Sequence, residues 1–261
     1  MTEQSDFIDD VSKKVILEAG SIAKQYKNKL IVKYKSKNQP VTNADIAIDN
    51  FIKDFFKKKT PSYGWVSEES MDNNSRYEKD KFWCLDPIDG TRSYISGKPE
   101  YTISLALIKN QEPVIGLVLN PETEELFFAK KNNGASCNGK KINVNSNESI
   151  DSSRFSISSS EVKRLKRYDF FQKRNVIEMG SIAYKISLVA KGVIDAALSF
   201  TKKNDWDLAA SDLILKEAGG SIKKISGEKI VYNTKQMKIE SVIASNFKLS
   251  QKICTRLNEQ K

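Results

Sequence analysis

The stretch CLDPIDGT, residues 84–91, places two carboxylates, a proline, a glycine and a threonine directly after an apolar run. That run predicts a buried strand over residues 82–85, which would deliver Asp86 at its carboxyl end. The proline stiffens the chain and the glycine permits a tight turn. Carboxylate, carbonyl and hydroxyl oxygens can therefore converge on one point, as they do around a hard cation. Asp-Pro and Asp-Gly are also common in plain turns, so a structural role is the alternative.

The chain contains no histidine among its 261 residues. Without imidazole, Ser-His-Asp and Cys-His nucleophile systems and His-ligated zinc or iron sites are excluded. Any catalysis must use carboxylates, hydroxyls, lysines or a metal ion, and carboxylate oxygens select Mg²⁺, Mn²⁺ or Ca²⁺. The three cysteines are far apart and form no CxxC pair, which fits reduced thiols in a cytoplasmic protein.

Composition indicates an ordinary globular chain with a basic surface. Hydrophobic residues make up 39% of the sequence. A membrane-spanning helix needs about 18 consecutive apolar residues, and the sequence contains no apolar run of that length. The polar start MTEQSDFIDDVSKK lacks the features of a signal peptide, so we expect a cytoplasmic protein with no membrane partner. The formal net charge of +10 is carried mostly by lysine, which is commonly a solvated charge. The densest basic cluster, residues 161–174, is either a solvated amphipathic segment or a nucleic-acid-binding surface.

Helical and strand patterns alternate along the chain and predict an α+β protein whose sheets and helices pack in layers. We expect one compact unit over residues 1–261. The polar stretch 143–153 is the best place for a seam between an N-terminal half and a C-terminal α/β half. Helices are predicted at about 6–26, 43–55, 181–192, 206–220 and 247–260. Strands are predicted at about 31–35, 63–70, 81–86, 102–110, 113–121, 125–131, 154–160, 175–180 and 194–200.

The second predicted helix begins close to a candidate acidic residue. Asn43 is its predicted N-cap, and Ala44, Ile48 and Ile52 share one apolar face. Asp45 falls in the first turn, where the helix dipole favours a carboxylate. This dipole role alone can explain Asp45.

Two further acidic elements stand at the ends of predicted strands and helices. Glu68 and Glu69 follow the strand-like YGWV, and Asp207 opens a helix whose Ala209 and Ala210 allow close packing. Taken singly, a Glu-Glu pair is usually solvated and an Asp near a helix start is usually a cap. Gathered in one pocket, these carboxylates would repel one another unless cations neutralised them. Paired divalent ions about 4 Å apart would do so, and they suit attack of water on a phosphate ester.

Four sequence blocks carry a resemblance to a known family. These are VTNAD (41–45), SEES (67–70), DPIDGT (86–91) and WDLAA followed by EAGG (206–220). In order and spacing they resemble the inositol monophosphatase superfamily of metal-dependent, lithium-sensitive phosphatases, over nearly the whole chain. The resemblance implies a layered αβαβα sandwich of the sugar-phosphatase type, and also a homodimer, because relatives are commonly dimeric.

The resemblance further implies a site for two or three Mg²⁺ ions. The first would activate the attacking water and the second would stabilise the leaving ester oxygen. The matching positions are Glu68, Asp86, the Ile88 carbonyl and Thr91 for the first ion, and Asp86, Asp89 and Asp207 for the second.

The catalytic positions also carry over by resemblance. Asp45 and Thr91 match the pair that orients and deprotonates the water, around a third ion that also touches Glu68. A threonine hydroxyl bonded to a carboxylate can relay a proton without histidine. The backbone N–H groups of Gly90 and Thr91, heading a short helix, could receive the phosphate, and Asp207 would also reach the substrate.

The region expected to hold the leaving group departs from inositol-specific relatives. Gly180 and Ser181 match their GS/T-A block, but Phe200 stands where they have a carboxylate. An aromatic ring with Lys202 and Lys203 would suit a nucleotide base and a second phosphate, as in bacterial 3'(2'),5'-bisphosphate nucleotidases. The alternative for Phe200 is a core aromatic at the end of a strand.

These observations favour a Mg²⁺-dependent phosphomonoesterase that converts 3'-phosphoadenosine 5'-phosphate to AMP and phosphate. The same chemistry on inositol 1-phosphate is the first alternative, and histidinol phosphate is the second. An alternative of another class is an RNA- or transcription-complex-binding protein, because some bacterial members of the superfamily have such roles and the chain is basic. A pure binding module has no need of the complete set of metal-site residues, which favours the enzyme.

Overall fold

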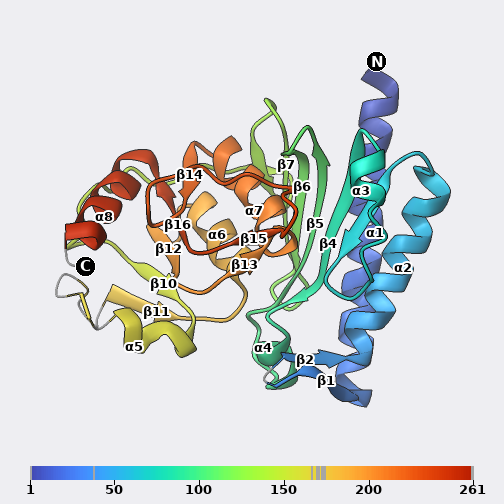
Figure 1. The fold of residues 1–261 in the computed structure, drawn as a ribbon, viewed down its shortest axis with the longest axis horizontal. Coiled ribbons are helices and arrows are strands. Elements are labelled where there is room, and N and C mark those ends of the chain that lie inside the picture. The colour runs from blue at the N-terminus through green and yellow to red at the C-terminus, as the bar shows by residue number, and fades with distance from the viewer. Residues whose placement is uncertain (1, 38, 166, 169–170, 172–174, 260–261) are drawn as a thin grey trace.

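Five layers follow one another across the molecule, and they confirm the predicted αβαβα sandwich (Figure 1). This computed structural model describes residues 2–37, 39–165, 167–168, 171 and 175–259. Across it lie a helix pair, a seven-stranded sheet, a second helix pair, a five-stranded sheet and a last helix. In that order the helices are α1 (Thr2–Tyr26) and α2 (Asn43–Lys59), then α6 (Ile182–Ala190) and α7 (Asp205–Glu217), then α8 (Phe247–Glu259).

The seven-stranded sheet keeps the order of the sequence, β3 to β9, and only its β3–β4 pair is parallel. The short helix α3 (Ser75–Glu78) connects β3 to β4. Because these two strands are parallel, their carboxyl ends lie side by side. The strands are β3 (Gly64–Ser67), β4 (Lys81–Asp89), β5 (Thr102–Lys109), β6 (Glu112–Asn120), β7 (Glu125–Lys130), β8 (Ala135–Cys137) and β9 (Lys140–Lys141).

The five-stranded sheet is mixed, in the order β11-β10-β12-β16-β14. Its strands are β10 (Phe155–Ile157), β11 (Val176–Glu178), β12 (Ala196–Ser199), β14 (Gly220–Lys223) and β16 (Val242–Asn246). Two small antiparallel two-stranded sheets complete the strands, β1 (Val32–Ser36) with β2 (Gln39–Thr42) and β13 (Lys203–Asn204) with β15 (Lys238–Ile239). The remaining helical turns are α4 (Thr91–Ile95), α5 (Val162–Leu165) and 3₁₀ turns at Lys27–Lys29 and Ser159–Glu161.

Three apolar clusters fill the spaces between the layers. One joins α1 and α2 to the first sheet, the central one surrounds α6 and α7, and the third lies between the second sheet and α8. Helix α6 is buried along its whole length because a sheet covers each side of the central layer. Within the described residues no helix is both long and apolar enough to cross a membrane. Residues 143–152, near the predicted seam, contain no helix or strand and connect the first sheet to the second.

Two local predictions are corrected by the structure. Strand β4 does not stop at Leu85 but continues to Asp89, with one extra residue between the pairs Asp86–Ser104 and Asp89–Thr102. This bulge turns the strand so that both aspartates can face the same cavity. The N-cap of α2 is Thr42 and not Asn43, because the Asn43 side chain instead bonds the backbone around residues 29–31.

Helix α7 lies unusually close to the first sheet at Gly116 of β6. A Cβ atom on Gly116 would lie 2.5 Å from the Ala210 carbonyl oxygen and 3.1 Å from its Cα, so only backbone could yield. We expect Gly116→Ala to destabilise the fold by about 1–3 kcal/mol, the usual cost of overpacking. A urea titration followed by far-UV circular dichroism measures this. An unchanged midpoint would mean that α7 can move away from the sheet without cost.

Candidate active site

A cavity of about 640 Å³ opens where the β3–β4 edge meets the starts of α6 and α7. Its wall combines the first sheet, the central helices and the segment 158–161 before α5. Most of the residues predicted from the sequence line it. They are Glu68, Asp86, Ile88, Asp89, Gly90, Thr91, Gly180, Ser181, Lys203 and Asp207.

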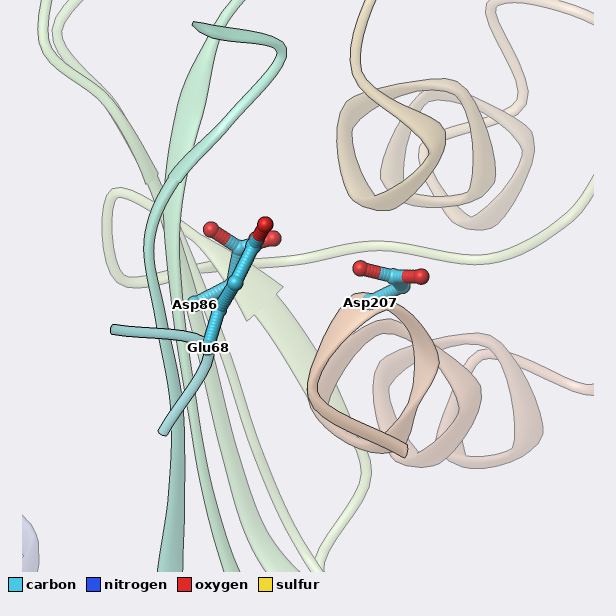
Figure 2. A group of neighbouring side chains, drawn as sticks. All are labelled: Glu68, Asp86 and Asp207. Atoms are coloured by element: carbon cyan, nitrogen blue, oxygen red, sulfur yellow. The ribbon is translucent and has the colours of Figure 1, made fainter. Parts of the chain in front are cut away.

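Three carboxylates form the centre of this cavity. Glu68 follows β3, Asp86 lies on β4, and Asp207 is in the first turn of α7, facing the other two across a gap (Figure 2). One oxygen from each lies within 4.8 Å of the others, a spacing at which a single cation could contact all three. The geometry therefore fits a divalent metal held by oxygen ligands.

Asp89 links the tip of β4 to the start of α6. Its Oδ2 accepts hydrogen bonds from the Ser181 hydroxyl and the Ala183 N–H, both at 2.6 Å. Ser181 is held at a φ of 47°, and its Oγ also accepts the Tyr184 N–H that opens the helix. One side of the Asp89 carboxylate is thus fixed by protein donors, which leaves Oδ1 as the oxygen available to a cation.

Thr91 lies between two oxygen acceptors. Its hydroxyl oxygen is 3.0 Å from the Ile88 carbonyl and 3.5 Å from Asp45 Oδ1. The other Asp45 oxygen accepts the Thr42 N–H at 2.8 Å and the Thr42 hydroxyl at 2.5 Å, in a capping box. Asp45 therefore caps its helix with one oxygen and presents the other to Thr91, so both the dipole role and the catalytic role predicted for it are compatible with its position.

Burial makes ionisation of this cluster costly without a cation. Burial, reinforced by the Glu68 and Asp89 charges, raises the pKa of Asp207 to about 7. Burial raises the pKa of Asp45 to about 6 despite the Thr42 hydrogen bonds, and that of Asp86 also lies well above its ordinary value. Such a donor set fits Mg²⁺, since a hard cation would offset the repulsion and hold the carboxylates ionised.

One lysine already neutralises part of the cluster. Lys35 Nζ, on β1, lies 2.7 Å from Glu68 Oε1 and 2.8 Å from Glu69 Oε1. Burial opposes the Lys35 charge, but the two glutamates outweigh it and raise the Lys35 pKa. Lys35 was missed in the sequence because nothing in the strand-like IVKYK distinguishes it from a solvated lysine.

Comparison with known proteins agrees with this geometry. The model of the inositol monophosphatase family matches residues 4–261. The chain belongs to the inositol monophosphatase family. A fructose-1,6-bisphosphatase/inositol-1-monophosphatase of Aquifex aeolicus is 32% identical over 224 residues, which are 81% of this chain and 83% of that protein.

Two other family members give the range of similarity. A 3'(2'),5'-bisphosphate nucleotidase CysQ of Aggregatibacter actinomycetemcomitans is 28% identical, over 85% of this chain and 84% of that protein. The solved structure of an inositol monophosphatase of Thermotoga maritima is 28% identical and superposes with a TM-score of 0.84, covering 96% of each chain. The chain is thus similar to both kinds of phosphatase, with identities of 32% and 28%.

We expect Mg²⁺ to stabilise this family member more at about pH 8 than at about pH 5. A carboxylate whose folded pKa is raised stabilises the fold below its unfolded pKa, and that stability is lost as pH rises through the folded value. The folded pKa values are about 6 for Asp45 and about 7 for Asp207, so the stability that these two groups contribute is lost as the pH rises through those values. Metal binding needs the ionised carboxylates, so the gain in melting temperature on adding millimolar Mg²⁺ should grow over the same interval. Equal gains at both pH values would contradict the assignment.

Phe200 and Lys202, predicted to contact the leaving group, do not line the cavity. The Phe200 ring stacks on Tyr168 with ring centroids 5.9 Å apart and packs against the apolar cluster beneath α8. This position fits the alternative interpretation of Phe200 as a core aromatic at the end of a strand. Lys202 is two-thirds exposed and lies 3.8 Å from Glu240. Lys203 does line the cavity, and its ammonium donates to the Thr201 hydroxyl at 2.9 Å.

Charged residues that were not predicted from the sequence also line the cavity: Arg92, Lys98, Glu100, Glu161 and Glu178. Glu161 lines the cavity from the segment before α5, and Lys185 of α6 is fully buried and bonded to Ser158 of that segment. Glu161 was hidden at the start of the basic cluster 161–174, of which residues 166, 169–170 and 172–174 lie outside the described residues. A signal for Lys185 was present, because it is the one charged residue in the otherwise uncharged SIAYKISLVA.

Proposed function

We propose that the chain is a Mg²⁺-dependent phosphomonoesterase that uses water to release phosphate from a small organic phosphate. The observation that carries this proposal is the convergence of Glu68, Asp86 and Asp207 within 4.8 Å, beside the Thr91–Asp45 pair. When bound, Mg²⁺ lowers the pKa of a water and neutralises charge that develops on the phosphate and the leaving oxygen. Glu68, Asp86, the Ile88 carbonyl, Asp89 and Asp207 would hold two such ions, and Asp45 would serve a third.

The chain's own groups perform the proton transfer in this proposal. The Thr91 hydroxyl takes a proton from the attacking water as it passes its own proton to Asp45 Oδ1, 3.5 Å away. Burial raises the pKa of Asp45 to about 6, which makes this carboxylate a better proton acceptor than an exposed aspartate. The backbone N–H groups of Gly90 and Thr91, at the start of α4, are the proposed phosphate contacts.

The finer proposal from the sequence is hydrolysis of 3'-phosphoadenosine 5'-phosphate. Its supports are Lys98 and Lys203, whose side chains line the cavity and could receive a second phosphate. The supports from Phe200 and Lys202 are lost. Inositol 1-phosphate remains the main alternative, and histidinol phosphate follows it.

The test is phosphate release from these three substrates side by side, with Mg²⁺ and with EDTA. Mg²⁺-dependent release from any of them supports the phosphomonoesterase, and the ratio of kcat/KM values ranks the leaving groups. If none is hydrolysed, the proposal fails and the RNA-binding alternative takes its place. In that case RNA affinity should fall steeply with salt. Lithium inhibition and a homodimer remain predictions, tested by the same assay with LiCl and by light scattering.

A further inference from the structure

The part of the cavity wall formed by residues 158–161 contains a carboxylate, that of Glu161, which can accept hydrogen bonds from a ligand. Glu161 ends the 3₁₀ turn Ser159–Glu161 and is only 2% exposed, yet it lines the cavity. Its Oε1 accepts the Phe200 N–H at 2.7 Å and lies 3.1 Å from the Ser199 hydroxyl. Segments almost forty residues apart therefore hold the carboxylate in one orientation.

The second oxygen of Glu161 is less fully used. Among the described residues its Oε2 has only the Ser199 hydroxyl as a partner, at 3.2 Å, and that hydroxyl is shared with Oε1. A carboxylate oxygen can accept two hydrogen bonds, and an unfilled acceptor in a buried position is costly. Oε2 is thus positioned to accept hydrogen bonds from a ligand in the cavity.

The surroundings of Glu161 form a rigid polar wall. Lys185 Nζ, fully buried, donates to the Ser158 hydroxyl at 2.7 Å and to the Met179 carbonyl at 3.1 Å. It thereby fixes the two segments that flank Glu161 on the cavity side. Burial lowers the Lys185 pKa to about 8, although the charges of Asp89 and Glu161 oppose this change.

The charges of this wall discriminate between kinds of leaving group. A carboxylate accepts hydrogen bonds from hydroxyl groups, but it repels a second phosphate placed beside it. Glu178 of β11 lines the same side of the cavity and adds a second negative charge. Lys98 and Lys203 also line the cavity and could receive a second phosphate placed away from Glu161, so it is Glu161 itself that favours a neutral leaving group with several hydroxyls.

We propose that Glu161 is a specificity-determining residue that accepts hydrogen bonds from the hydroxyl groups of a polyol phosphate and disfavours leaving groups that carry a second phosphate. This inference rests on the proposed phosphomonoesterase function. Glu161 lies outside the four sequence blocks that carry the family resemblance. In this proposal it selects among the substrates named above.

Glu161→Gln tests the proposal with three substrates: inositol 1-phosphate, 3'-phosphoadenosine 5'-phosphate and phenyl phosphate, whose leaving group has no further hydroxyl. The kcat/KM ratio of inositol 1-phosphate to phenyl phosphate should fall about tenfold, mostly through KM, because hydrogen bonds to a charged acceptor are lost. The ratio of the bisphosphate to phenyl phosphate should rise. Glu125→Gln is the matched control, since Glu125 accepts the Tyr184 hydroxyl at 2.7 Å away from the cavity and should change neither ratio.

Unchanged ratios, or an equal loss on all three substrates, would overturn the proposal, the latter because it indicates a merely structural role. If Glu161→Gln fails to fold, Glu161→Asp keeps the charge and withdraws it by one methylene, and the inositol ratio should again fall. An unchanged ratio in that folded variant would also overturn the proposal. The activity of the wild-type protein distinguishes a failure of the Glu161 proposal from a failure of the proposed function. If the wild type releases no phosphate from any of the three substrates with Mg²⁺, the phosphomonoesterase proposal itself is overturned.

Discussion

Asp89→Asn should lower kcat at least about a thousandfold while the protein remains folded. A bound metal ion supplies several kcal/mol of transition-state stabilisation, and about 1.4 kcal/mol is worth a factor of ten in rate. The amide can still accept the Ala183 N–H through its oxygen, so the junction between β4 and α6 is kept. The charge offered to the cation is lost. Steady-state phosphate release at saturating Mg²⁺ measures the effect.

Although Asp89→Asn should lower kcat, it should not lower the stability of the metal-free protein. Burial raises the Asp89 pKa, so an uncharged amide removes an unfavourable buried charge from the metal-free protein. Its melting temperature without Mg²⁺ should equal or exceed that of the wild type, and the increase on adding Mg²⁺ should shrink.

Asp195→Asn is the matched control for Asp89→Asn. Asp195 is also buried and accepts a backbone N–H, that of Arg154 at 2.7 Å, but it does not line the cavity. Its replacement should reduce stability and leave kcat within about twofold of the wild type, as expected for a change outside the site. Near-normal turnover by Asp89→Asn would exclude Asp89 as a metal ligand.

Thr91→Val should reduce kcat by about a hundredfold to ten-thousandfold, the usual contribution of a positioned proton-transfer group. Valine keeps the shape of the side chain and removes the hydroxyl that lies between Asp45 and the Ile88 carbonyl. Because the backbone N–H of residue 91 is unchanged, KM should move much less than kcat. Pre-steady-state phosphate release shows whether the chemical step is the one affected.

Thr91→Ser provides the control, since it restores the hydroxyl without the methyl group. Its kcat should lie within about tenfold of the wild type, because serine retains the proton relay but has more rotamer freedom. Equal losses in the valine and serine variants would show that the methyl packing, and not the hydroxyl, is what the reaction requires.

The gathering of Glu68, Asp86 and Asp207 in one cavity was predictable because each follows a local sequence signal. Asp86 and Asp89 lie within one strand end and one turn, and Asp207 lies in a helix start that its own capping residues define. The layered α+β fold was predictable in outline, since periodicity marks the longer helices and most of the strands. Strands β14 and β16 of the second sheet were not predicted. The bulge in β4 was also missed, because it depends on the register with Ser104 and Thr102 of the neighbouring strand.

The leaving-group wall was not predictable because long-range contacts build it. Glu161 is oriented by Ser199 and Phe200, and no local pattern connects these positions. Phe200 was assigned to the cavity from its position before the WD block. Side chains alternate faces at a strand, so its place just after β12 instead directs it to the cluster beneath α8.

Strand β16, formed by residues 242–246, lies in the interior of the five-stranded sheet between β12 and β14. During synthesis β16 leaves the ribosome after β12 and β14, so the second sheet stays divided until then. Until it inserts, one side of the central helices lacks its complete cover. Truncation before residue 242 should therefore yield an aggregation-prone chain in which the first sheet can form but the second sheet stays incomplete.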